Sequence, residues 1–408
     1  MSKISSYDVV IVGAGMVGAS LACAIAPTNL SIALIEPVLF NDDQQPSYDD
    51  RGISLSPSSK RILEHIGIWQ SIYPNATPIK KIHISNQKKF GFTHLAASEA
   101  GLTELGHVVI ARSLGNALHK KIKQYKNIKL FCPAELNNFV KHNSNISLQV
   151  ILPEGNSTIN TKLLVGADGS HSLVRKLAGI KTKEHNFEQT AIVANVTTQK
   201  PNQFTAYERF TPHGPIAFLP VEGNRFVLIF TVDTHKASYY LSMSDDKYLE
   251  IIENEFGRRL GKIQEIGKRH TYPIFFIEAV NQFQENLILL GNAAHTIHPN
   301  AAQGFNLGLR DVAGLAECIY SAQEKKQPIN DMDIFNKYIE LRHSDQQRII
   351  KLTNSIASSF YNTSLLSASL ANTIMLLLDF IPVFRSLFLK RAMGLAGYQP
   401  RLVRGLQL

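Results

Sequence analysis

The stretch "YDVVIVGAGMVGASLACAIA", residues 7–26, carries the clearest structural signal in the sequence. A short run rich in β-branched residues stops at a glycine-rich turn, and a segment with an apolar helical face follows, which predicts strand, turn and helix in that order. Gly13, Gly15 and Gly18 form the pattern G-x-G-x-x-G. The first glycine allows a tight turn, the second lets the backbone approach a pyrophosphate, and the third lets helix and strand pack closely. The free N–H groups at the start of the helix would then face the phosphates.

The next predicted strand, "SIALIE" at residues 31–36, ends on an acidic residue. Glu36 follows Gly13 by twenty-three residues, which is the place where a dinucleotide-binding unit puts an acid to accept hydrogen bonds from the adenosine ribose. A glutamate there disfavours a 2′-phosphate, so NADP is a poor candidate for this site. FAD or NAD remains.

Composition sets the broad class of the protein. The chain has 408 residues, of which 44% are hydrophobic and 18% are charged, so we expect a globular protein of two or three domains. The net charge of +9 is compatible with nucleic acid, an anionic membrane or a polyanionic cofactor. No nucleic-acid motif accompanies the charge, so we expect no nucleic-acid partner.

Three widely spaced cysteines, without a CxxC pair or a signal peptide, predict a reduced, cytoplasmic protein. The most apolar late segment, "NTIMLLLDFIPVF" at residues 372–384, is shorter than the roughly 20 residues that a spanning helix needs. The cationic residues near the end of the chain alternate with Leu and Phe, which suits either an amphipathic surface on anionic lipid or a helix packed on the protein. Both interpretations stay open; the first would place the protein at the inner face of the membrane.

Two further predicted strands end in polar turns. The segment "TKLLVGADGSHSLVR", residues 161–175, has the form D-G-x-x-S-x-x-R after its strand, beginning at Asp168 and Gly169. The segment "LILLGNAAHTIHPNAAQGFNLGLRD", residues 287–311, reaches a glycine and an amide at Gly291 and Asn292, and continues into a helical pattern. Together with the first glycine turn, these segments can converge on one elongated ligand.

In order and spacing, the three motifs resemble those of the FAD-dependent aromatic hydroxylases, the single-component flavoprotein monooxygenases related to p-hydroxybenzoate hydroxylase. The segments "DDRGISLSPSSKRILEHIGIW" at 49–69 and "YERFTPHGPIAFLP" at 207–220 resemble the ubiquinone-biosynthesis branch, and within it the 2-polyprenyl-6-methoxyphenol hydroxylases. Two positions depart from the wider family. Asn292 stands where most members have Asp, and Ala302 stands where the pattern has Gly, which adds a Cβ near the expected flavin edge.

The resemblance implies an α/β fold: a Rossmann-like FAD-binding domain, an inserted antiparallel-sheet substrate domain and a C-terminal helical region. The FAD-binding domain would be discontinuous. We expect it at residues 1–75, 101–180 and 270–340, the substrate domain at 76–100 and 181–269, and the helical region at 341–408.

The resemblance also implies a set of cofactor-binding residues. For Arg51 the alternative is a surface ion pair with Asp49 or Asp50. Arg51, Pro299 and Gln303 are the candidates near the flavin ring, and the sequence names no catalytic base. The implied cofactor-binding residues are Gly13, Gly15, Gly18, Glu36, Arg51, Arg112, Asp168, Gly169, Gly291, Asn292, Gly304, Phe305 and Asn306.

Several other side chains invite a functional interpretation. His295 and His298 have a spacing that could suit a metal, but no carboxylate or cysteine accompanies them and Pro299 interrupts the helix, so we expect a structural role and no metal. Aromatic residues in the middle of the chain are candidates for a phenol pocket, although aromatics at strand spacing are most often core. These are Phe210, Phe218, Phe275 and Phe276.

By this resemblance, the enzyme would hydroxylate a polyprenylated phenol with O2 through a flavin C4a-hydroperoxide, with NAD(P)H as transient electron donor. Partners would be the phenol, O2 and other ubiquinone-biosynthesis proteins. Three alternatives remain: hydroxylation at another ring position, an NAD-dependent dehydrogenase that uses the first glycine turn alone, and a non-catalytic flavin-binding scaffold of a quinone-synthesis complex. The dehydrogenase would leave Asp168 and Gly169 unexplained.

Overall fold

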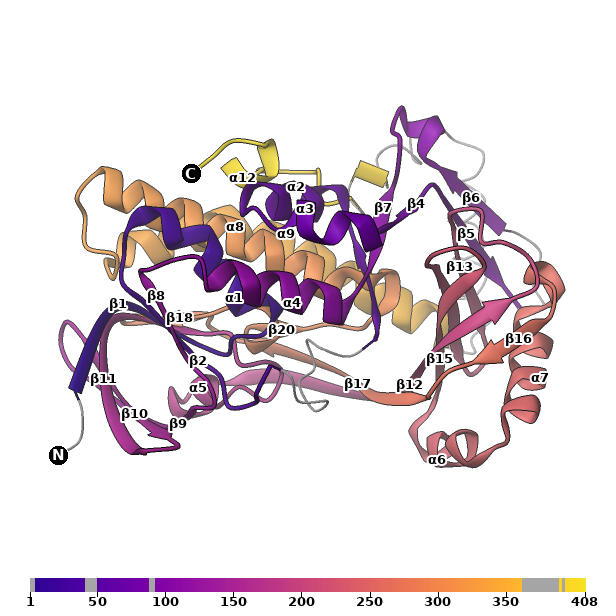
Figure 1. The fold of residues 1–408 in the computed structure, drawn as a ribbon, viewed down its shortest axis with the longest axis horizontal. Helices are drawn as coiled ribbons and strands as arrows, with labels where there is room; N and C mark the ends of the chain where they lie inside the picture. The colour runs from indigo at the N-terminus through magenta and orange to yellow at the C-terminus, as the bar shows by residue number, and fades with distance from the viewer. Residues whose placement is uncertain (1–3, 41–49, 88–91, 362–388, 391–392) are drawn as a thin grey trace.

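The structure is a computed structural model that describes residues 4–40, 50–87, 92–361, 389–390 and 393–408. It contains a mainly parallel sheet covered by helices and a larger antiparallel sheet at the other end of the molecule (Figure 1). The chain passes between the two sheets several times. This is the α/β architecture that the motifs predict.

The parallel sheet forms because its strands are buried on both faces and therefore consist of nearly continuous apolar runs. β1 lies between β11 and β2 and pairs in parallel with both. The strands in order are β18 (Phe283–Gln284), β19 (Leu287–Leu289), β11 (Gly155–Gly166), β1 (Ile4–Val12), β2 (Ile32–Ile35) and β8 (Ile128–Phe131), with β10 (Ile146–Leu152) and β9 (Glu135–Lys141) attached to β11.

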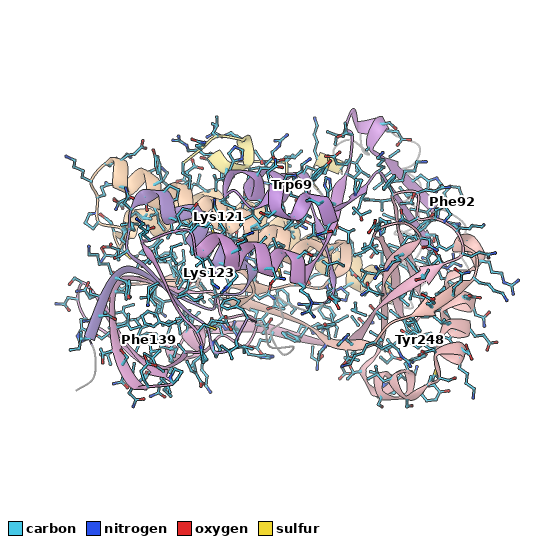
Figure 2. The ribbon with its side chains drawn as sticks, viewed as in Figure 1. Trp69, Phe92, Lys121, Lys123, Phe139 and Tyr248 are labelled. Carbon is cyan, nitrogen blue, oxygen red and sulfur yellow. The ribbon has the colours of Figure 1, made fainter. Side chains whose placement is uncertain are left out.

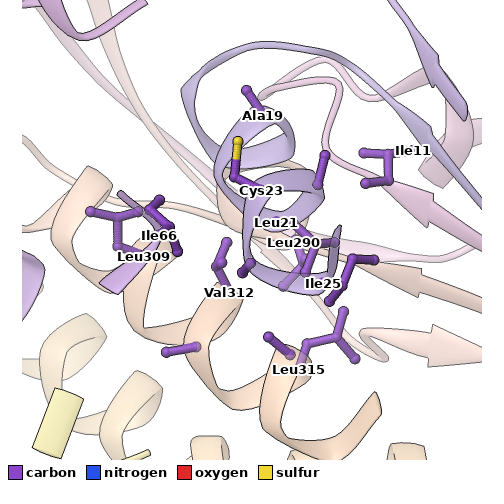
Figure 3. Packing of buried hydrophobic residues seen from close by; sticks show 14 of the residues in the cluster. Ile11, Ala19, Leu21, Cys23, Ile25, Ile66, Leu290, Leu309, Val312 and Leu315 are labelled. Atoms are coloured by element: carbon purple, nitrogen blue, oxygen red, sulfur yellow. The ribbon is translucent and has the colours of Figure 1, made fainter. Parts of the chain in front are cut away.

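Helices cover one face of this sheet. Leu114 and Leu118 are buried on α4, as its amphipathic pattern predicts, and Figure 3 shows Leu21 and Ile25 of α1 packed near Val312 of α8. Full burial of each such side chain contributes about 1.5–3 kcal/mol. The opposite face is covered by β9, β10 and α5. The helices are α1 (Met16–Ile25), α4 (Ala111–Ile122), α5 (Leu173–Leu177), α8 (Gln303–Glu324) and α9 (Met332–Tyr361).

The antiparallel sheet follows from alternating sequences such as "RFVLIFTV" at residues 225–232. Two helices, α6 (Thr234–Ser242) and α7 (Asp245–Phe256), lie on its outer side in Figure 1. The strands in order are β20 (His295–Thr296), β17 (His270–Ala279), β12 (Thr182–Thr198), β15 (Arg225–Asp233), β14 (Gly214–Pro220), β13 (Thr205–Thr211), β5 (Lys81–Asn86) and β6 (Phe92–Ala96), with β16 (Ile263–Ile266) paired to β12.

The two faces of this sheet differ. On the outer face, Phe218, Phe226 and Phe230 pack with Tyr248 of α7, in the region labelled Tyr248 in Figure 2. The inner face looks toward the rest of the protein. It presents Ala191 and Val193 of β12, Ala206 of β13, Leu219 of β14, and Val227 and Ile229 of β15.

A small sheet joins the two larger ones. It consists of β3 (Gly52–Leu55), β7 (Gly106–Ile110) and β4 (Thr77–Ile79). β3 leads directly into α2 (Pro57–His65), which begins with a proline in its first turn and the Ser56 cap, and α3 (Trp69–Ile72) follows. The segment from residue 50 to residue 59 therefore runs from the antiparallel sheet to the helices.

The end of the described chain packs on the protein. Tyr398 Oη donates a hydrogen bond to Glu317 of α8 at 2.6 Å, and α12 (Arg401–Arg404) buries Leu402 and Val403. For this part, the structure matches the interpretation of a packed C-terminus.

The apolar segment at 372–384 lies outside the described residues. α9 is one helix that runs through the boundary expected between residues 340 and 341. Within the described ranges, the helices are too short or too polar to cross a membrane.

Candidate active site

Four predicted site residues lie at one edge of the parallel sheet. Because neighbouring parallel strands end at the same edge, the residues that follow β1, β2, β11 and β19 are brought together. Val12 pairs with Gly166 and with Ile35, and Gly166 pairs with Leu289. Gly13, Glu36, Asp168 and Gly291 are located within two residues of these strand ends.

The first glycine motif forms a cradle that excludes side chains. Gly13 has φ +96°, and a Cβ there would overlap the carbonyl of Ala167. A Cβ on Gly18 would overlap the carbonyl of Gly13. Gly15 is the residue before α1 and has no capping side chain, so the first N–H groups of this helix stay available to a ligand. This cradle fits a dinucleotide pyrophosphate.

Glu36 is held beside this cradle. Its carboxylate is buried and accepts hydrogen bonds from the N–H of Ala14 at 2.8 Å and from that of Val38 at 3.2 Å. The acid thus has a fixed position at the end of β2, next to the glycine turn. This placement suits a carboxylate that also accepts bonds from a ribose.

The D-G-x-x-S-x-x-R motif is a fixed turn. Asp168 accepts hydrogen bonds from Ser172 Oγ at 2.5 Å and from the N–H of Val174 at 3.0 Å, while burial raises the pKa of its carboxyl. Arg175 donates to the carbonyl of Ala293 at 2.8 Å. The arginine therefore joins the second motif to the third. Sequence reasoning singled out Ser172 and Arg175 but gave them no role.

The third motif packs directly on the first. Gly291 has φ +58°, and a Cβ there would lie 3.1 Å from the side chain of Val17 on α1. A Cβ on Gly308 of α8 would approach the same side chain equally closely. Asn292 is exposed beside this contact. Small residues at 291 and 308 thus allow α1 and α8 to meet.

The beginning of α8 is tied to the segment that follows Arg51. Asn306 Oδ1 accepts from the N–H of Ser56 at 2.8 Å and from Ser59 Oγ at 2.6 Å, while its Nδ2 donates to the carbonyls of Ser54 and Ala302, both at 2.8 Å. The amide is buried and its oxygen and nitrogen both have partners. Its side chain is therefore a structural connector. No sequence signal predicted this bond, because the partners are about 250 residues apart.

Ala302 has a backbone conformation that favours glycine. Its φ of +50° and ψ of +41° lie in the left-handed region, immediately before α8. Alanine at this position is therefore strained, since a Cβ disfavours this conformation by about 1–2 kcal/mol. Gly304 and Phe305, in the first turn of α8, remain partly exposed.

The two predicted arginines have different surroundings. The Arg51 guanidinium lies 4.6 Å from the ring centre of Tyr272 on the inner face. Asp49, one of the two partners in the alternative ion pair, lies outside the described residues. Arg112, at the start of α4, instead forms an exposed ion pair with Asp50 at 3.1 Å. Gly52, next to Arg51, lets the backbone pack closely on the antiparallel sheet, because a Cβ there would lie only 2.7 Å from Val227.

The turn between Pro299 and Gln303 combines exposed and buried groups. Pro299 is exposed, whereas Gln303 is buried at the first position of α8. Asn300 is 3% exposed, and within the described chain neither polar atom of its side chain forms a hydrogen bond. A buried amide of this kind costs about 1–3 kcal/mol unless a ligand satisfies it, which fits a polar cofactor at this turn.

His295 belongs to a buried ionic network. Its Nε2 is 2.5 Å from Asp311 Oδ2, and Arg342 Nε donates to Asp311 Oδ1 at 2.8 Å. Asp345 forms ion pairs with Arg342 and with Arg310, each at 2.8 Å. Burial alone would raise the pKa of Asp311, but Arg342 and His295 lower it to about 2. His298 packs against Phe187, and burial lowers its pKa to about 4. Within the described fold, His295 thus takes part in an ionic network and His298 in aromatic packing.

A cavity of about 1230 Å³ opens at the end of the antiparallel sheet, between β12, the β13–β14 turn and the end of α9. Phe276 lines it, and Phe210 is buried nearby on the inner face of β13. The prediction that Phe218 lines a phenol pocket is wrong, because Phe218 is on the outer face of the sheet. Along β14 the inward positions are those of its neighbours Ala217 and Leu219. Phe275 stacks on His171 with ring centres 5.4 Å apart.

Comparisons with known proteins agree with this arrangement. Residues 6–339 match the family described as FAD binding domain. The chain is 32% identical to the ubiquinone hydroxylase UbiL of Rhodospirillum rubrum over 98% of its length and 93% of that protein. It is 29% identical to the 3-demethoxyubiquinol 3-hydroxylase of Escherichia coli, over 83% and 86% of the two chains.

Among solved structures, p-nitrophenol 4-monooxygenase PnpA of Pseudomonas putida has the same fold. The TM-score is 0.79 at 14% identity, with 98% of this chain and 100% of that chain covered. The matched family extends over all three motifs and the antiparallel sheet. This chain is therefore a member of the FAD-dependent aromatic hydroxylase family, in which FAD is the cofactor and the ubiquinone hydroxylases are its relatives.

Proposed function

We propose that this protein hydroxylates the aromatic ring of a polyprenylated phenol in ubiquinone biosynthesis, and that its substrate is a 2-polyprenyl-6-methoxyphenol. The observation that carries the proposal is the likeness to UbiL, which extends over 98% of the chain, including the antiparallel sheet. The reaction converts an aromatic C–H into C–OH, uses one atom of O2, and releases the other as water. NAD(P)H would supply the two electrons.

The proposal assigns the FAD contacts to the converging motifs. Gly13, Gly15 and the start of α1 would hold the pyrophosphate, and Glu36 would hold the adenosine ribose. Asp168, Gly169, Gly291 and Asn292 would contact the ribityl and phosphate region, with Arg112 near the phosphates. Arg51, Pro299, Gln303 and the backbone of Gly304, Phe305 and Asn306 would surround the flavin ring. When bound, FAD would carry the two electrons from NAD(P)H to O2 and so activate one oxygen atom for transfer.

The inner face of the antiparallel sheet would cover the substrate. It is largely apolar, and an apolar surface excludes water from a reactive oxygen species. The cavity of about 1230 Å³ at the end of this face is large enough for a substrate with an isoprenoid chain. Phe276 on its wall would contact the apolar part of the ligand.

The proposal also includes a membrane surface. A polyprenylated phenol is dissolved in the bilayer, so we infer that the protein meets it as a peripheral protein at the cytoplasmic side. The apolar sequence at residues 372–384 and the net charge of +9 support this inference, because both favour an anionic lipid surface. Other ubiquinone-biosynthesis proteins would be the partners there.

A second candidate is hydroxylation at a different ring position. It is favoured by the likeness to the 3-demethoxyubiquinol 3-hydroxylase, because the matched motifs concern FAD and carry little information on the ring. The two candidates differ in the intermediate that accumulates when the protein is absent.

The test is mass spectrometry of quinone lipids from cells in which only this protein has been deleted and all other hydroxylases are kept. The proposal predicts accumulation of a 2-polyprenyl-6-methoxyphenol. A more advanced intermediate that lacks a different ring oxygen would favour the second candidate, and unchanged ubiquinone would contradict both.

Complementation with Gly15→Val separates catalysis from scaffolding. The branched side chain occupies the place where the pyrophosphate approaches, so we expect loss of FAD and of ubiquinone synthesis. Gly267→Val is the matched control, because Gly267 is exposed and a Cβ there has only ordinary contacts. Full ubiquinone synthesis by a flavin-free Gly15→Val protein would show a scaffold instead of an enzyme.

A further inference from the structure

Glu208 occupies the middle of the inner face. Side chains alternate along β13, so Tyr207 and Arg209 point to the outer face and Glu208 points inward with Ala206 and Phe210. The register places Glu208 between Ile84 of β5 and Ala217 of β14. The same row continues through Ile229 and Val193. The carboxyl is thus surrounded by apolar neighbours on both adjacent strands.

This carboxyl has no partner in the described part of the chain. It takes part in no hydrogen bond or ion pair there, although Arg209, the next residue, donates to the carbonyl of Glu255 on the outer side. Glu208 is half-buried. Burial alone, without an opposing charge, raises its pKa to about 7.

Charged groups on the elements around Glu208 are distant. The inward positions of β5, β6 and β14 carry no titratable side chain. On β15 the alternation gives inward charges only to Arg225 and Asp233, at its two ends and each four residues from Ile229. The packed residues Leu105, Val108 and Met393 are apolar. Arg51, which stacks on Tyr272, and His270 lie at β17. β17 is four strands from β13, or roughly 19 Å at the usual spacing between strands.

Glu208 forms no described contact by which its charge would stabilise the fold. A carboxylate in apolar surroundings is unfavourable unless it is paired, and nothing in the described structure pairs it. Unpaired titratable groups in apolar surroundings are typical of catalytic acids and bases, because a pKa near the working pH permits proton transfer in both directions. Other polar atoms of the inner face also lack partners among the described residues, namely Thr231 Oγ1 and Gln189 Oε1. The face is therefore built for a ligand with polar groups.

We propose that Glu208 is the catalytic carboxylate that takes the phenolic proton of the substrate. The O–H bond of the phenol breaks, the proton binds a carboxylate oxygen of Glu208, and the electron pair stays on the phenol oxygen. The ring becomes more electron-rich at the positions ortho and para to that oxygen, which favours transfer of an electrophilic oxygen atom. The proton returns to the oxygen of the hydroxylated product once aromaticity is restored, so the carboxylate is regenerated. This inference rests on the proposed function, because it requires a phenol.

The test compares the FAD-loaded wild type with Glu208→Gln, using a 2-methoxyphenol with a short prenyl group at C6 as the probe. Two quantities are measured between pH 5 and pH 10: kcat, and the ultraviolet band of phenolate in the bound probe under anaerobic conditions. Glu222→Gln is the matched control, because Glu222 is exposed in the β14–β15 turn of the same sheet. FAD content and the melting temperature are recorded for each variant, so that misfolding is recognised.

In the wild type and the control, kcat and the phenolate band both rise with pH through about 7, because the base must be deprotonated to accept the proton. In Glu208→Gln we expect kcat at pH 7.5 to fall about 100-fold, the KM to change little, and the phenolate band to appear only near pH 10, the ordinary pKa of a phenol. Equal pH profiles for Glu208→Gln and wild type, with FAD bound, would overturn the role of Glu208 while leaving the proposed function intact. Failure of the wild type to bind and hydroxylate the probe would overturn both.

Discussion

Asp311 is a buried carboxylate in the FAD-binding half of the molecule, and Glu208 is a half-buried carboxylate in the antiparallel sheet. The two differ in their partners and in their pKa. Asp311, on α8, is fully buried and accepts bonds from His295, Arg342 and Gln346. Glu208, on β13, lies among apolar side chains with no partner in the described structure. One carboxyl is consequently more acidic than usual, with a pKa of about 2, and the other is less acidic, with a pKa of about 7.

The comparison separates a structural from a functional acid. The charges around Asp311 are satisfied within the protein and join α8 to α9 behind the flavin-binding motifs. No group in the described structure compensates the charge of Glu208, so a bound substrate would have to do so. Its unpaired state is thus a local cost to stability that a substrate would compensate, as is common at active sites.

The largest effect on stability is expected for Asp311→Asn. Removing one member of a buried ionic network leaves Arg342 and its neighbours uncompensated, so we expect a loss of about 3–5 kcal/mol in the free energy of unfolding, measured with urea at pH 7. The pKa of Asp311 is lower in the folded protein, so its contribution is present above pH 4 and disappears as the pH falls toward 2. Asp333→Asn, at an exposed position, is the control. An equal, small loss of unfolding free energy in both variants would contradict the structural role of Asp311.

Glu208→Gln is expected to change stability in the opposite direction. A pKa of about 7 in place of the ordinary 4.5 corresponds to a cost of at most about 3 kcal/mol above pH 7. Because the folded-state pKa is raised, this cost is absent below pH 4.5 and grows as the pH rises toward 7. We therefore predict that Glu208→Gln melts a few degrees above wild type at about pH 8 and level with it at about pH 4, by scanning calorimetry. A lower melting temperature at pH 8 would indicate that Glu208 has a stabilising partner.

The smallest effect is expected for Ala302→Gly. Glycine removes the strain of the left-handed conformation but adds freedom to the unfolded chain, so we expect a net gain of about 0.5–1 kcal/mol, with FAD affinity unchanged. Ala294→Gly is the control, because Ala294 has a negative φ and the substitution should destabilise. If Ala302→Gly were to destabilise the protein as well, Ala302 would have favourable packing that exceeds its strain.

The parts of the fold that the sequence predicts are those with local signals. Gly13, Gly15 and Gly18, the acid at Glu36 and the turn at Asp168 all follow strands with recognisable patterns, and parallel pairing brings them to one edge. The sequence even indicated the unusual position of Ala302. Each of these features depends on a few adjacent residues.

The features that the sequence could not predict depend on contacts between distant segments. Asn306 matched a family pattern for its backbone, yet its side chain holds Ser56 and Ser59. Phe218 was a candidate for the substrate pocket, but its position in the alternation of β14 puts it on the outer face. Glu208 was visible in "YERFTPHGPIAFLP" without a role, because only the register of β5, β13 and β14 shows that its neighbours are apolar.

The proposed hydroxylation of a prenylated phenol is tested by an isotope measurement on the purified, FAD-loaded protein. The enzyme is supplied with NADH, ¹⁸O2 and a 2-methoxyphenol with a short prenyl group at C6, and the product is analysed by mass spectrometry. We expect the wild type to give a product with one added oxygen atom on the ring, labelled with ¹⁸O, and Glu208→Gln to give only a trace of it at pH 7.5. An unmodified phenol, or a product whose new oxygen comes from water, would contradict the assignment of this protein as a ring hydroxylase of prenylated phenols.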